Sequence, residues 1–158
     1  MVKDELLLCE LQAKAFELSV TKMNTSSEIF IRRFMKSRIA GQFDNKSILE
    51  SNNQPGDILT AINEEYGISN YGSVKYTSNE MYWIGYIYRY ISIAYNLTSS
   101  QVYKIIKPKE LKGLYLAYHT LDVSQAAERI FEAKNIFSNE DEEIKRQYQI
   151  LKKIRCCS

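Results

Sequence analysis

One stretch of the chain, residues 80–96, is apolar or aromatic around nearly its whole circumference when it is drawn as a helix. From Met81 it reads Met-Tyr-Trp-Ile-Gly-Tyr-Ile-Tyr-Arg-Tyr-Ile-Ser-Ile-Ala-Tyr, and Arg89 is its only charge after Glu80. A helix that is hydrophobic on all sides must be covered by other elements of its own fold or by another chain. We therefore expect this helix to lie at the centre of the fold, and Gly85 to let another backbone come close to it.

Capping residues mark where further helices begin. Four segments place a side-chain acceptor at the N-cap and Glu or Gln three residues later, and they start at Thr25, Thr77, Thr98 and Asp122. Pro108 suits the first turn of another helix, with Glu110 favourable beside its positive end. Acidic residues after Ser138 and basic residues near the end of the chain predict a last helix over 138–155.

Apolar spacing completes the predicted architecture. An apolar stripe in the first segment comprises Leu7, Leu8, Leu11, Ala15 and Leu18, and a second continues from Ile29 to Phe43, so helices over 4–21 and 26–42 are expected. With 158 residues, 45% of them hydrophobic, the chain suits one globular domain. We predict an all-α fold, a single-domain bundle over 1–158 of five to seven helices. It comprises a helical hairpin (1–43), a loop-rich segment with a short helix that Gly67 ends (44–78), a Tyr-rich core (79–136) and the C-terminal helix (138–155).

Catalytic and metal-binding patterns are missing from the sequence. The only histidine is His119, and none of the six glycines falls in a phosphate-binding pattern. The three cysteines offer no metal pair or disulfide framework. We therefore predict no enzyme, no cofactor and no metal site. No basic leader and no run of about 20 apolar residues is present, which favours a cytoplasmic protein without a membrane span.

Eleven of the twelve tyrosines lie between Tyr66 and Tyr118, and helical spacing places some of them in one stripe with Arg89. One interpretation puts Arg89 inside the fold, against tyrosine faces and paired with a carboxylate or carbonyl. The other makes the stripe a surface for a partner, because interface centres are rich in Tyr and Arg. Residues 66–121 carry six bases and two acids, which adds local positive charge. The candidate partner-binding residues are Tyr82, Tyr86, Arg89, Tyr90, Lys104 and Lys109.

A DNA-binding alternative rests on the order of the helices. Residues 84–119 have the outline of a helix-turn-helix, in which the helix that begins at Pro108 would be the recognition helix. That helix contains no Asn or Gln to read bases and offers only Lys109, Glu110 and Lys112 near its start. A DNA-binding transcriptional regulator therefore remains the alternative prediction.

Three motifs carry a resemblance: the run from Tyr82 to Tyr90, Ser100-Gln-Val-Tyr-Lys-Ile-Ile106 and Tyr118-His-Thr-Leu-Asp122. In these the chain resembles small helical bacterial proteins of toxin–antitoxin-like gene pairs, some encoded beside toxins of ADP-ribosyltransferase type. The resemblance implies an antitoxin or immunity-like binder whose partner is a toxin, and it assigns no site residues. Self-association of the chain is a further interpretation left open.

Overall fold

The computed structural model describes residues 1–134, and these form helices joined by loops, with no strand in that part of the chain. The chain divides into two compact units, Met1–Tyr115 and Leu116–Ser158. The all-α class is confirmed, although eight α-helices among the described residues exceed the five to seven expected. The predicted helix over 138–155 lies outside the described residues. One domain over 1–158 stays a prediction.

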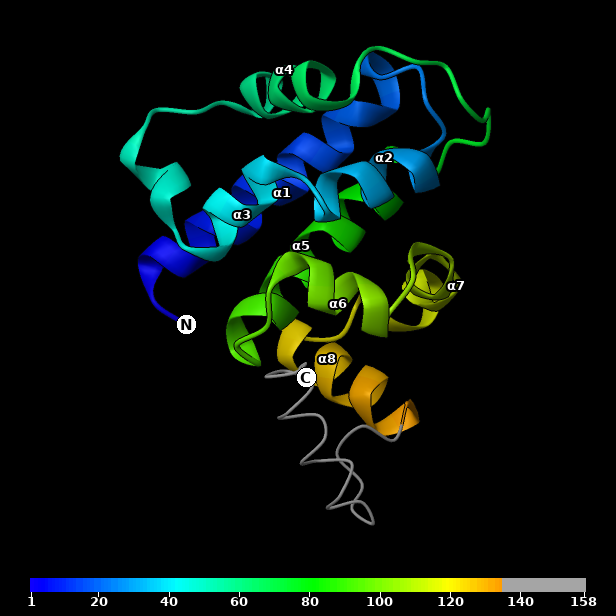
Figure 1. Ribbon diagram of the computed structural model, residues 1–158. Helices are drawn as coiled ribbons and strands as arrows, with labels where there is room; N and C mark the ends of the chain where they lie inside the picture. Colours follow the sequence, from blue (N-terminus) through cyan, green and yellow to red (C-terminus); the bar gives the residue numbers. More distant parts are fainter. Residues whose placement is uncertain (135–158) are drawn as a thin grey trace. The chain divides into compact units, whose positions relative to one another are not determined.

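The described residues form eight α-helices and one 3₁₀ helix, and α5 belongs to the first unit. The elements are α1 (Lys3–Lys22), α2 (Ser27–Met35), α3 (Arg38–Asp44), the 3₁₀ helix η1 (Ser47–Glu50), α4 (Pro55–Tyr66), α5 (Ser78–Ala94), α6 (Ser99–Ile105), α7 (Pro108–Tyr118) and α8 (Val123–Ala133). Helix α5 packs along α1 and also against α6. Figure 1 shows α1 between α4 and α5. The prediction that residues 80–96 are central is confirmed for this unit.

Gly85 sets how closely α5 approaches α1. A Cβ atom at this position would lie 2.8 Å from Phe16 Cγ and 3.0 Å from both Ala13 Cα and the Gln12 carbonyl oxygen. These distances leave no room for a side chain, so the two backbones meet where Gly85 exposes its own. The expected close approach of another backbone is confirmed.

The buried face of α1 differs from the predicted leucine stripe. Leu8 and Ala15 are buried, whereas Leu7 is 43% exposed and Leu11 and Leu18 are only half-buried. The residues buried along α1 are Leu8, Cys9, Gln12, Ala13, Ala15, Phe16 and Ser19. Several of them are small, as a close contact with α5 requires, so shape and not hydrophobicity alone decides which face is buried.

The predicted helix over 26–42 is two helices. The chain leaves α2 at Lys36, and Ser37 caps α3 by accepting from the Ala40 amide at 3.1 Å. The Ser37 hydroxyl also donates to the Phe34 carbonyl at 2.7 Å. A serine can satisfy backbone groups locally in this way, which favours a break despite continuous apolar spacing. Edge-to-face contacts of Phe34 with Phe16 and Phe43 hold the two short helices to the core.

Most predicted helix starts are confirmed, and one is displaced. Thr77 and Thr98 accept from N3 amides as expected, and Asp122 precedes α8. Helix α2 is capped by Ser26 and not by Thr25, because the Ser26 hydroxyl accepts from the Ile29 amide at 3.2 Å. Thr25 Oγ1 is buried without a hydrogen-bond partner among the described residues.

Two further features match the sequence prediction in part. Gly67 ends α4 at a positive φ of 83°, where glycine is favoured, and its amide donates to the Asn63 carbonyl at 2.8 Å. On α5, Ile87 and Ile91 are buried. Trp83 is only half-buried, although the whole helix was expected to be covered, and it packs edge-on against Tyr115 at 5.8 Å between ring centroids.

Burial makes the Cys9 thiol unreactive. It raises the pKa of Cys9 from an ordinary value of 9.0 to about 12, although the nearby Arg89 opposes the shift. The stability that the protonated thiol contributes is therefore complete below pH 9 and is lost as the pH rises from 9 towards 12. In a variant with Cys156→Ser and Cys157→Ser, we expect no reaction with a thiol reagent at pH 8 until denaturant is added. Rapid native-state labelling would contradict this placement of Cys9.

Candidate functional site

Arg89 is the centre of a buried polar cluster inside the first unit. Its side chain is completely buried, and every guanidinium nitrogen donates a hydrogen bond. The Nε atom donates to Gln12 Oε1 at 2.8 Å, and Nη1 donates to Asp44 Oδ1 at 2.7 Å and to Ser92 Oγ at 3.1 Å. Nη2 donates to Ser99 Oγ at 2.6 Å. One side chain thus connects α1, α3, α5 and α6.

The partners of Arg89 are themselves held in place. Gln12 Nε2 donates to the Gly85 carbonyl at 3.0 Å, so this amide bridges α1 and α5. The Asp44 carboxylate accepts from the Ser99 hydroxyl at 2.7 Å and from the Ser99 amide at 3.1 Å, at the start of α6. The Ser92 hydroxyl donates to the Leu97 carbonyl at 2.6 Å. Such mutual support fixes a single geometry for the cluster.

Electrostatics favour a structural role for this cluster. Burial lowers the pKa of Arg89 from its ordinary value, and the charge and hydrogen bond of Asp44 oppose that shift. The guanidinium carbon of Arg89 also lies over the Phe43 ring, 5.2 Å from the ring centroid. Beside the cluster, a cavity of about 160 Å³ is lined partly by Glu5 and Lys46, which form an ion pair of 3.2 Å. Because the charges are paired within the cluster, we assign it to holding the helices together.

The predicted stripe divides between the inside and the outside of the unit. Arg89 faces inward and pairs with a carboxylate, as one of the two interpretations proposed, but the ring beside it is Phe43 and not a tyrosine. Tyr82, Tyr86 and Tyr90 are half-buried. The rings of Tyr82 and Tyr86 are stacked, with centroids 6.4 Å apart. Arg89 is therefore not exposed for a partner in this structure, and the tyrosines remain predicted contact residues.

Acidic side chains of α1 act on two of these tyrosines. Burial raises the pKa of Tyr82 and Tyr86, and Glu10 on α1 adds to both shifts. The predicted bases lie on other elements, where Lys104 is exposed on α6 and Lys109 is exposed on α7. Lys109 lines a pocket together with Glu28, and none of the three tyrosines lines that pocket.

The partners of Arg89 could not be identified from the sequence alone. Gln12, Asp44 and Ser99 are separated from Arg89 by 77, 45 and 10 positions in the chain. Gln12 did leave a signal, because it lies four residues after Leu8 and four before Phe16 on the buried face of α1. A polar side chain at such a position needs a buried hydrogen-bond partner.

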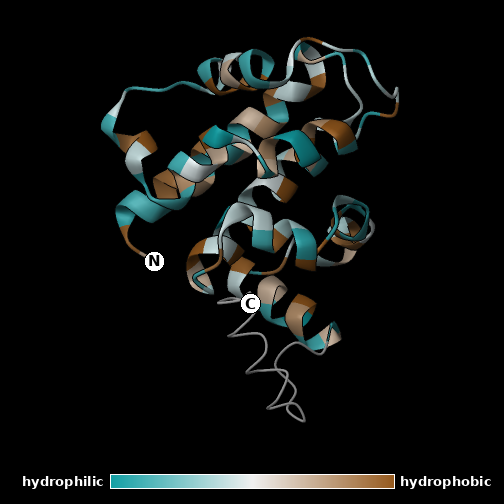
Figure 2. Ribbon diagram, in the orientation of Figure 1, coloured by the Kyte–Doolittle hydropathy of each residue, from teal (hydrophilic) through white to brown (hydrophobic). Residues whose placement is uncertain are grey.

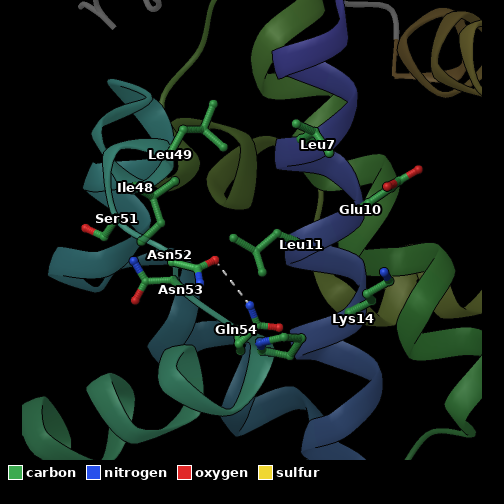
Figure 3. Close-up of a pocket in the computed structure, with 11 residues that line it drawn as sticks. Leu7, Glu10, Leu11, Lys14, Ile48, Leu49, Ser51, Asn52, Asn53 and Gln54 are labelled. Carbon is green, nitrogen blue, oxygen red and sulfur yellow. Dashed lines mark hydrogen bonds between the residues drawn. The ribbon is translucent and has the colours of Figure 1, made fainter.

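A second cavity, of about 360 Å³, lies between α1 and the segment that leads from η1 to α4. Figure 3 shows Leu11 pointing from α1 towards this segment, while the charged ends of Glu10 and Lys14 turn away. In the wall of the pocket, the side-chain amide nitrogen Nε2 of Gln54 donates a hydrogen bond to Asn52 Oδ1 at 3.5 Å. The lining contains one acidic and one basic side chain, Glu10 and Lys14, and therefore carries no net charge.

The connection between α4 and α5, residues 67–77, exposes large apolar side chains. Ile68, Tyr71 and Val74 are 77%, 67% and 66% exposed. Hydrophobic positions are visible along this connection in Figure 2. We refer to residues 67–77 as the exposed segment. Large apolar side chains that are exposed close together in the chain favour a contact with another protein over contact with water alone.

Hydrogen bonds fix the exposed segment to the start of α2. The Ser26 amide donates to the Tyr71 carbonyl at 2.9 Å, and the Ser27 amide donates to the Val74 carbonyl at 3.0 Å. Lys75 Nζ donates to carbonyls at the end of α1, including that of Val20 at 3.1 Å, and burial lowers its pKa. The segment is thus held to α2 and α1 from Tyr71 to Lys75, the second half of its apolar stretch.

Comparison with known protein families, with curated proteins and with solved structures found no match to this chain. In residues 1–134, no group of three or more His, Cys, Asp or Glu side chains is placed to hold a metal ion. None of the helices described there combines the length and the hydrophobicity that a membrane crossing requires. The helices of the predicted DNA-binding segment exist as α5, α6 and α7, and DNA binding stays a prediction.

Proposed function

We propose that this chain is a non-catalytic protein-binding module that acts as an antitoxin or immunity-like protein on a partner toxin in the cytoplasm. The observation that carries the binding role is the exposed segment, where Ile68, Tyr71 and Val74 face solvent and hydrogen bonds to α2 hold the backbone at Tyr71 and Val74. The antitoxin role, and a toxin of ADP-ribosyltransferase type as partner, rest on the sequence resemblance.

Physical chemistry supports binding by such a segment. Covering apolar side chains favours association at roughly 25 cal/mol per Å² of apolar area removed from water. A segment that is already ordered loses less conformational entropy on binding than a flexible one. The half-buried Tyr82, Tyr86 and Tyr90 are the second predicted contact region, since tyrosine combines apolar area with a hydrogen-bonding hydroxyl.

Co-expression with the neighbouring gene tests the proposal. The tagged chain is expected to co-purify the untagged product of the adjacent gene and to restore growth of cells that this product arrests. The combined change Ile68→Ser, Tyr71→Ser and Val74→Ser should weaken binding by at least about thirtyfold, the size of one lost hot spot of about 2 kcal/mol. Leu116→Ser, at an apolar residue that is 82% exposed elsewhere, is the matched control and should leave binding within about twofold.

Three outcomes would contradict the proposal. The first is a parent chain that neither captures the neighbouring product nor restores growth. The second is that neither the triple variant nor variants of Tyr82, Tyr86 and Tyr90 bind the partner more weakly than the parent does. The third is DNA binding that weakens steeply with salt while no protein is captured, because such a slope reports phosphate contacts.

A further inference from the structure

The exposed segment forms one wall of a pocket whose chemistry indicates what kind of partner segment it accepts. We propose that this pocket receives an aspartate or glutamate side chain from an extended, partly apolar segment of the partner protein. This inference rests on the proposed function and adds the chemistry of the partner. It depends on three features of the described residues, which are the shape of the pocket, its charges and its apolar rim.

The pocket has a volume of about 450 Å³ and lies within the first unit. One wall is the exposed segment, through residues 72–74 and Tyr76, and another is the start of α2, through Ser26 and Glu28. Lys109 and Lys112 of α7 form the remaining side. Residues from three separate parts of the chain therefore face one space.

Backbone geometry keeps this wall in place. Gly72 adopts a positive φ of 74°, and a Cβ there would lie 2.7 Å from both Cβ and Oγ of Ser26. The segment can pass this close to α2 only because position 72 lacks a side chain. Tyr76, which follows, is buried, and its amide donates to Ser27 Oγ at 2.9 Å.

The charges of the pocket favour an anionic side chain. Lys109 is exposed and has no ion-pair or hydrogen-bond partner within residues 1–134. Lys112 reaches Glu80 only at 3.9 Å and lies over the Tyr76 ring at 5.6 Å. The one acidic side chain of the lining, Glu28, already accepts from the Tyr76 hydroxyl at 2.6 Å. Lys109 and Lys112 against Glu28 give the lining itself one net positive charge, while Glu80 pairs with Lys112 from outside the lining and leaves Lys109 as the uncompensated base.

The apolar rim favours a protein segment over a free anion. Val74 lines the pocket, and its side chain is 66% exposed. Tyr71, three residues earlier in the chain, is 67% exposed. A small anion would contact the lysines and leave these side chains in water. An extended peptide places side chains about 3.3 Å apart along its length, so one residue can enter the pocket while its neighbours cover the rim.

A peptide titration tests the pocket without the partner. The probes are acetyl-Val-Asp-Val-Glu-Val-amide and its uncharged counterpart acetyl-Val-Asn-Val-Gln-Val-amide, followed by amide chemical shifts of the ¹⁵N-labelled full chain. The acidic peptide should shift residues 72–76 and 109–112, and the amide peptide should bind at least about tenfold more weakly. Inorganic phosphate at the same concentration should shift these residues less than the acidic peptide does.

Charge variants make the test specific. Lys109→Glu should weaken binding of the acidic peptide by at least about tenfold, and Glu28→Gln should strengthen it about threefold because a repulsive charge is removed. Lys104→Glu is the matched control, since Lys104 is an exposed base on α6 that does not line the pocket. Its effect should stay within about twofold.

Several results would overturn the inference. They are equal binding of the acidic and uncharged peptides, shifts confined to other residues, equal weakening by Lys109→Glu and Lys104→Glu, or phosphate binding as strong as that of the acidic peptide. If the neighbouring product still co-purifies with Lys109→Glu at the parental level, the pocket assignment fails while the proposed function stands. If the parent captures no protein but the acidic peptide binds as expected, the proposed function fails instead.

Discussion

Arg89→Ala is expected to lower the free energy of unfolding by about 3–5 kcal/mol, because the change removes one partner of a buried ion pair. The variant loses the bonds that join Arg89 to Gln12, Asp44 and Ser99 and leaves space where a fully buried side chain stood. A loss of this size is a large fraction of the 5–15 kcal/mol that stabilises a typical domain. Urea unfolding followed by circular dichroism measures it.

Two comparisons identify the cause of that loss. Arg89→Met keeps much of the volume and should cost less than Arg89→Ala, because hydrophobic groups can replace buried ion pairs at little expense of stability. Lys104→Ala, at an exposed base, should change the free energy of unfolding by no more than about 0.5 kcal/mol. Parental stability of Arg89→Ala would show that the cluster does not hold the helices together.

Gly85→Val is expected to cost about 3 kcal/mol, since a Cβ at this position would already lie 2.8 Å from Phe16 Cγ. Two backbone atoms of α1, Ala13 Cα and the Gln12 carbonyl oxygen, lie at 3.0 Å, so the helices must separate to make room. Separation would also weaken the bond from Gln12 to Arg89.

Gly113→Ala is the matched control for this position. It lies within α7, and a Cβ there would meet nothing within 4 Å. It should stabilise the protein by up to about 1 kcal/mol through helix propensity. Thermal unfolding of both variants against the parent measures the difference, and a Gly85→Val protein as stable as the parent would mean that α1 and α5 are not in close contact.

The sequence predicts well those features that depend on residues close together in the chain. The central place of α5 follows from its own composition, because a helix without a polar face cannot lie at the surface alone. The caps at Thr77 and Thr98 are likewise local hydrogen bonds. The break at Ser37 was missed because apolar spacing continues across it, while the serine offers the backbone a competing local geometry.

The candidate sites depend on contacts that local patterns do not contain. Asp44 pairs with Arg89 only because the turn at Lys36 and Ser37 directs α3 towards the start of α6. The tyrosine stripe was correctly located on α5, but helical spacing alone could not show that Arg89 turns inward beside it. The exposed segment lies in the part of the chain predicted to be loop-rich, but only the structure shows that its apolar side chains face solvent.

Hydrogen–deuterium exchange tests the binding surface most directly. The chain is compared alone and in complex with the product of the neighbouring gene, and the backbone amides of residues 67–77 are followed. We expect these amides to exchange more slowly in the complex, because the partner covers Ile68, Tyr71 and Val74. Unchanged exchange in residues 67–77, with protection confined to other parts of the chain, would contradict the claim that the exposed segment binds the partner.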